Sequence, residues 1–128
     1  MSYSHTRQNL FNKKILYIEN SYDQAKFIKI LCSNAHMHCD VAQDSSTGIE
    51  KCKTSHYDII FIHIGMPMMD GYNIAKEIKT QKITTPILFT SGHTLSYLNK
   101  DIVNEFNFIS KPIQIDIFLD KLDNLLGK

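Results

Sequence analysis

Four apolar runs of this chain end in polar side chains whose types could do chemistry together. Glu19 and Asn20 follow the first run, His63 ends another, and Ser91 and Lys111 follow two later ones. Any one of them could be polar only because strand ends meet solvent. A carboxylate, an amide, an imidazole, a hydroxyl and an ammonium gathered in one pocket are better explained by function than by packing.

The elements that must position these residues alternate in type along the chain. Strands are predicted by short apolar runs at 14–18, 57–62, 87–90 and 106–109, and by strand-like alternation at 36–42. Apolar residues at helical spacing follow each predicted strand. Ser21 and Gln24 have capping-box spacing at the start of the first helix, and Ser45 or Ser46 is expected to begin the second. Five strands alternating with five helices predict an α/β fold with a doubly wound parallel sheet. In such a sheet the strand ends converge on one crevice, which would bring the polar residues together.

Bulk properties describe an ordinary globular domain. The net charge of +1 gives no basic field, so we expect no nucleic acid bound directly by this domain. No run approaches the roughly 20 apolar residues of a membrane span. Residues 1–13 are polar and lack a signal-peptide core, so we expect a short leader and one domain at 14–127, in the cytoplasm. Cys32, Cys39 and Cys52 lack CxxC spacing and are expected to be small core hydrophobes rather than disulfides or zinc ligands.

The motifs around the polar residues resemble the receiver domain of bacterial two-component response regulators. The segment 63–71 matches the third-strand signature of that family everywhere except at its first position, His63. The matching loop contains Gly65, Met66, Pro67, Asp70 and Gly71. This resemblance, which covers about residues 14–126, implies a flavodoxin-like (βα)5 fold with the strand order 2-1-3-4-5.

Further matches carry the resemblance to the end of the chain. Residues 86–93 resemble the fourth strand of the family and place Ser91 as the switch hydroxyl. Phe108 falls at the switch aromatic, three residues before the lysine. Lys111 and Pro112 resemble the characteristic Lys-Pro pair, whose peptide bond is cis in this family.

The departures from the family concern its chemistry. The resemblance implies an aspartate at the position of His63, which accepts a phosphoryl group from a histidine kinase. It also implies two acidic residues after the first strand, which hold Mg²⁺ together with that aspartate and a backbone carbonyl, here that of Gly65. This chain has Glu19 but Asn20, so two of the three carboxylates are replaced. Because Mg²⁺ prefers carboxylate oxygens, we expect weak or lost Mg²⁺ binding, no cofactor and no aspartyl phosphorylation.

These features predict a signalling module rather than an enzyme. We expect a degenerate receiver of a two-component phosphorelay that binds a histidine kinase, a phosphotransfer protein or an output protein without being phosphorylated. A Glu19–Lys111 or Glu19–His63 pair is expected to hold one conformation, since one carboxylate faces one ammonium. Receivers dock and dimerise through the fourth helix, fifth strand and fifth helix, so a homodimer through these elements is a further expectation, and no membrane contact is expected.

Several alternatives remain open from the residues alone. His63 could itself accept a phosphoryl group, or could bind a transition metal such as zinc with Glu19 and His93. Protonation of His63 could also make the domain a pH-sensitive switch. An enzyme class, a flavodoxin-like cofactor protein, fits less well, because residues 19–22 offer no glycine- or threonine-rich phosphate cradle.

Overall fold

A computed structural model describes residues 7–65, 71–92, 101–104 and 106–127. Its centre is a five-stranded parallel sheet with the order β2-β1-β3-β4-β5. The strands are β1 (Lys14–Ile18), β2 (His38–Ala42), β3 (Ile59–His63), β4 (Ile87–Ser91) and β5 (Phe108–Ser110). The predicted fold class and strand order are confirmed.

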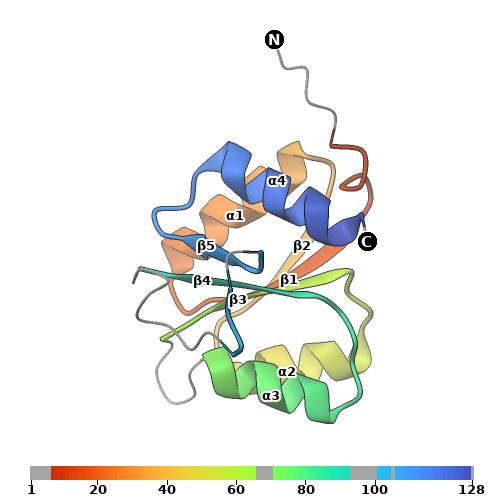
Figure 1. Ribbon diagram of the computed structural model, residues 1–128, viewed down its shortest axis with the longest axis vertical. Coiled ribbons are helices and arrows are strands. Elements are labelled where there is room, and N and C mark those ends of the chain that lie inside the picture. The colour runs from red at the N-terminus through yellow and green to blue at the C-terminus, as the bar shows by residue number, and fades with distance from the viewer. Residues whose placement is uncertain (1–6, 66–70, 93–100, 105, 128) are drawn as a thin grey trace.

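Helices cover both faces of this sheet. They are α1 (Tyr22–Asn34), α2 (Ser45–Thr54), α3 (Gly71–Thr80) and α4 (Ile115–Leu126). In Figure 1, α1 and α4 lie on one side of the sheet, and α2 and α3 lie on the other. The helix predicted between β4 and β5 falls largely on residues 93–100, outside the described part of the chain. No helix among the described residues is long and apolar enough to cross a membrane.

The two helical layers make the central strands apolar on both sides, which explains their continuous apolar runs. Alternate residues of β1 and β3 point to opposite layers. Leu16, Ile18, Ile60 and Ile62 pack in the layer of α2 and α3, whereas Ile15, Tyr17, Ile59 and Phe61 pack in the layer of α1 and α4. The rings of Tyr17 and Phe61 stack with their centroids 4.4 Å apart.

The N-cap predicted for α1 is confirmed, whereas the N-cap predicted for α2 is wrong. Ser21 caps α1, and its hydroxyl accepts a hydrogen bond of 3.2 Å from the Gln24 amide, as its spacing predicts. For α2 the cap is Asp44, not Ser45 or Ser46, and its carboxylate accepts a 2.7 Å bond from the Thr47 amide. A negatively charged cap also gains from the positive end of the helix dipole.

The N-terminal segment packs against the domain from Arg7 onward, although its polar composition predicts a leader that ends at residue 13. Leu10 is buried with only 2% of its surface exposed. The Arg7 guanidinium lies 2.9 Å from the Asp120 carboxylate and 3.1 Å from that of Asp116. The backbone N–H of Asn9 donates a 3.0 Å hydrogen bond to the Asp123 carboxylate. The polar residues of this segment therefore pair with the acidic side of α4, and the packed part of the chain begins before residue 14.

Candidate functional site

The polar strand ends meet at the carboxyl edge of the sheet, as expected for a doubly wound fold. Glu19 directly follows β1, His63 ends β3, Ser91 ends β4 and Lys111 directly follows β5. The ladder bonds continue past these ends: the Glu19 amide donates to Ala42 over 2.9 Å, and the Lys111 amide donates to Ser91 over 2.9 Å. The hydrogen bonds of the sheet therefore fix the backbone positions of Glu19 and Lys111.

The carboxylate of Glu19 is the centre of the site and is fully buried. Its Oε1 accepts a 2.7 Å hydrogen bond from the Tyr17 hydroxyl and a 3.0 Å bond from the Lys111 ammonium. Its Oε2 accepts from the Ser21 amide over 3.2 Å and lies 2.9 Å from His63 Nδ1. Both expected contacts, to Lys111 and to His63, occur together on a single carboxylate.

The contact between His63 and Glu19 is electrostatic in character. The two atoms are 2.9 Å apart, but the N–H of Nδ1 does not point at the oxygen within hydrogen-bond geometry. The His63 side chain is 20% exposed, so solvent protons reach it. The attraction is full only when the imidazole is protonated.

The surroundings keep Glu19 ionised. Burial alone would raise the pKa of its carboxyl group, but His63, the Tyr17 hydroxyl and Lys111 together lower that pKa to about 2. Burial and the charge of Glu19 raise the pKa of Tyr17, so its hydroxyl stays a neutral donor. One buried carboxylate thus faces the Lys111 ammonium, and the two charges balance.

Tyr17 is the member of the site that sequence reasoning missed. It lies two residues before Glu19 within β1, whose other core positions are aliphatic. A tyrosine inside an otherwise aliphatic buried strand is a usable signal, because a buried phenol needs a polar partner. Here that partner is the carboxylate at the end of the same strand.

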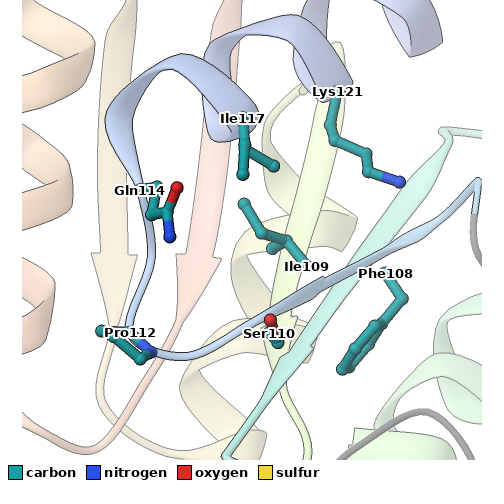
Figure 2. Close-up of a pocket in the computed structure, with 7 residues that line it drawn as sticks. All are labelled: Phe108, Ile109, Ser110, Pro112, Gln114, Ile117 and Lys121. Atoms are coloured by element: carbon teal, nitrogen blue, oxygen red, sulfur yellow. The ribbon is translucent and has the colours of Figure 1, made fainter.

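The switch positions are both buried. Ser91 is 1% exposed and Phe108 is 8% exposed. Phe108 packs in the core layer of α2 and α3, and in Figure 2 its ring points away from α4. Thr90, which pairs in register with His63, is also buried, and its Oγ1 has no hydrogen-bond partner among the described residues.

The remaining predicted residues do not all join the pocket. Asn20 is exposed, unlike its neighbour Glu19. Gly65 is exposed and has a φ of +93°, a conformation that favours glycine. Gly71 is buried, and a Cβ there would lie 3.1 Å from the carbonyl oxygen of His63, so the start of α3 packs directly on the end of β3. The peptide bond between Lys111 and Pro112 is cis, as the resemblance implies.

Some predicted residues lie outside the described part of the chain. Met66, Pro67, Asp70 and the proposed zinc ligand His93 belong to this group. Within the described ranges, His, Cys, Asp and Glu form no cluster of three that could hold a metal ion. The described donor set does not fit Mg²⁺, because its one carboxylate already faces Lys111, Tyr17, Ser21 and His63.

Comparison with known proteins identifies the class to which this fold and site belong. Residues 15–123 match the model of the response regulator receiver domain, and the chain belongs to this family. It is 28% identical over 118 residues to the response regulator ArlR of Staphylococcus saprophyticus, covering 90% of this chain and 53% of that protein. It is 25% identical over 111 residues to the transcriptional regulatory protein DltR of Streptococcus agalactiae, covering 85% and 50%. The chain spans about half the length of the curated relatives it matches.

Solved structures agree on the fold. The receiver domain of the Francisella response regulator 1452 matches with a TM-score of 0.81 at 25% identity, covering 91% of this chain and 98% of that one. The receiver domain of the Pseudomonas aeruginosa sensor histidine kinase PA1611 matches with a TM-score of 0.83 at 18% identity, covering 91% and 99%. That domain was solved with a magnesium ion coordinated in its active-site cleft.

Proposed function

We propose that this chain is a degenerate receiver, a module of two-component signalling that acts by protein–protein contact without being phosphorylated at His63. One observation carries the proposal: the buried Glu19 carboxylate contacts both Lys111 and His63. In a phosphorylated receiver the lysine and the metal neutralise the phosphoryl oxygens. Here the lysine already has a partner, so the pocket is electrically balanced without a phosphoryl group.

The chemistry of the acceptor position supports the same proposal. An acyl phosphate requires a carboxylate nucleophile, and the last residue of β3 is an imidazole. The PA1611 domain coordinates magnesium in its cleft, whereas the described residues at the corresponding edge of this sheet supply one buried carboxylate, Glu19, which is already paired with Lys111. The role we propose is accordingly binding and not catalysis.

The proposed module has a single conformation. The Glu19–Lys111 contact links β1 with the edge strand β5, and the inward Phe108 ring occupies the core layer of α2 and α3. These contacts need no ligand. We propose that partners recognise this one conformation at all times.

The proposed partners are a histidine kinase, a phosphotransfer protein or an output protein, and a second copy of this chain. For the second copy we propose the face formed by β5 and α4, which is the fifth helix of the sequence-based prediction. The fourth predicted helix, the other element of that expected face, lies largely outside the described residues. A hollow of about 260 Å³ lies there, lined among others by Phe108 to Ser110, Ile117 and Lys121. Figure 2 shows these side chains. Phe106 and Ile117 are 69% and 45% exposed beside it, and β5 is an edge strand. A two-fold copy presents the same edge and the same apolar side chains, so the face is self-complementary.

Treatment with acetyl phosphate and Mg²⁺ tests the absence of phosphorylation. We expect intact-mass spectrometry, at neutral pH, to detect no adduct on the wild-type chain. The matched control is the double variant His63→Asp and Asn20→Asp, which restores the missing carboxylates and is expected to gain Mg²⁺-dependent phosphorylation. A stable wild-type adduct mapped to this pocket would overturn the proposal. An acid-labile adduct on His63 would overturn it as well and would support phosphohistidine chemistry.

The 2.9 Å contact between His63 and Glu19 favours a second candidate function, a proton-dependent switch. Protonation of His63 would add a second positive charge beside the Glu19 carboxylate, which already faces Lys111. Titration of the His63 ring by NMR, with amide shifts followed at Phe108 and Ser91, tests this candidate. Switching predicts that the His63 and Phe108 signals change together, whereas a locked pocket predicts changes confined to His63.

A further inference from the structure

Tyr17 reaches the pocket from the interior of the domain. Its side chain is fully buried in the core layer of α1 and α4. Its hydroxyl donates over 2.7 Å to Glu19 Oε1, the same oxygen that accepts the 3.0 Å hydrogen bond from the Lys111 ammonium. The Lys111 side chain is 21% exposed. The carboxylate is therefore held by a phenol on its core side and by an ammonium nearer to solvent.

Aromatic packing fixes the direction of the Tyr17 hydroxyl. The Tyr17 ring stacks on Phe61, with the centroids 4.4 Å apart and the ring planes 16° from parallel. Phe61 in turn packs against Phe118 of α4, at a centroid distance of 5.2 Å. All three rings are fully buried. Because a close-packed core leaves such rings little room to move, the hydroxyl stays directed at the Glu19 carboxylate.

The contacts of the Glu19 carboxylate leave no site for a further ligand. An ionised carboxylate offers roughly four lone-pair sites. Its Oε1 accepts from Tyr17 and Lys111. Its Oε2 accepts from the backbone N–H of Ser21 and lies 2.9 Å from His63 Nδ1. A cation that approached Glu19 would have to displace one of these described partners.

We infer that Tyr17 is a positioning residue that holds Glu19 in its paired arrangement and withholds the carboxylate from a divalent cation. The inference rests on the proposed function, which requires a pocket that is balanced without metal. It goes further, because it assigns the poor fit of the pocket to Mg²⁺ to a third residue besides His63 and Asn20. Restoring the two missing carboxylates should then restore only part of the Mg²⁺ affinity.

The test measures the Mg²⁺ affinity of the full chain by isothermal titration calorimetry. The background is the double variant His63→Asp and Asn20→Asp, which carries both missing carboxylates. Adding Tyr17→Phe keeps the stacked ring and removes only the hydroxyl. It should tighten Mg²⁺ binding about tenfold, because the cation no longer competes with a hydrogen bond to the charged carboxylate. Adding Glu19→Gln to that triple variant should abolish the gain.

Tyr57→Phe in the same background is the matched control. Tyr57 is also buried, and its hydroxyl also donates to a carboxylate over 2.7 Å, that of Asp40. It precedes β3, at the opposite end of that strand from His63, so its loss should leave the Mg²⁺ affinity unchanged. Tyr17→Leu is a second variant that should show the same gain, should Tyr17→Phe fail to fold by circular dichroism.

The outcomes separate this inference from the proposed function. Equal Mg²⁺ affinity with and without the Tyr17 hydroxyl would overturn the inference alone. Weaker binding would do the same, because it is the result expected of a purely structural residue. An equal gain from Tyr57→Phe, or misfolding of both Tyr17 variants, would also overturn it. Saturable Mg²⁺ binding by the wild-type chain would overturn the inference and the proposed function together.

Discussion

Glu19 is the residue on which the electrostatics of the pocket depend, because Lys111, His63 and Tyr17 all contact its two oxygens. A buried carboxylate is stable in the charged state only when its partners outweigh the cost of burial. Their effect is large enough to hold its pKa near 2. The conformation of the site should accordingly depend on this one ionisation.

The substitution Glu19→Gln should therefore weaken the acid dependence of stability. The folded-state pKa of Glu19 is about 2 and its ordinary value is 4.5, so its ionisation stabilises the fold above pH 4.5. That contribution, about 3 kcal/mol from the size of the shift, is lost as the pH falls from about 4.5 to about 2. Urea unfolding at pH 7 and pH 3 measures it. An equal loss of stability in Glu19→Gln and wild type would contradict this role.

At the scale of elements, the N-terminal segment and α4 form one unit. Leu10 is buried in the core layer of α1 and α4. The ion pairs of Arg7 with Asp116 and Asp120 lie at the surface of α4. A buried apolar side chain contributes much more to the free energy of unfolding than a surface ion pair does. We therefore expect Leu10 to stabilise the fold more than Arg7.

The substitution Leu10→Ala should cost about 2–4 kcal/mol of unfolding free energy, since it empties a buried position. Arg7→Ala should cost at most about 1 kcal/mol and should matter less at high salt, because its ion pairs with Asp116 and Asp120 are partly exposed. Chemical denaturation at low and high salt separates the two effects. Equal, small losses for both variants would mean that residues 7–13 add nothing to the fold.

How far the sequence predicts the elements depends on where the deciding contacts lie. The strand at 14–18 is predicted residue for residue, because both of its faces are buried and its apolar run is unbroken. The strand predicted from residue 36 begins at His38 instead, since His36 has a left-handed φ of 62° in the turn after α1. A single edge strand with half-buried residues gives a weaker periodic signal than a central one.

The candidate site shows the same division. The positions of Glu19, His63 and Lys111 at one edge follow from topology, and the structure brings their side chains together. Topology does not predict that Asn20 is exposed or that the Tyr17 hydroxyl donates to Glu19, because both depend on the direction of a side chain. The pairing of Arg7 with α4 joins residues more than 100 positions apart, beyond the reach of any local pattern.

For the whole molecule, the proposed assembly through β5 and α4 is the property most open to direct measurement. The substitution Ile117→Asp places a charge at the rim of the hollow beside the edge strand and should shift the chain from dimer to monomer. Ile30→Asp on α1 is the matched control, since Ile30 is 51% exposed on another surface. Sedimentation equilibrium reports both. A wild-type monomer at all concentrations, or equal effects of the two variants, would rule out this interface.

The contact between Lys111 and Glu19 also has a kinetic meaning. It closes a loop between residues 92 positions apart and joins β1 to β5 across the ends of β3 and β4. Closing so long a loop is entropically costly until the intervening strands have paired. The contact should therefore form after the main barrier to folding, and its loss should speed unfolding while leaving the folding rate nearly unchanged. The pocket, for which we propose no phosphoryl chemistry, would then still act as a latch that sets the lifetime of the folded domain.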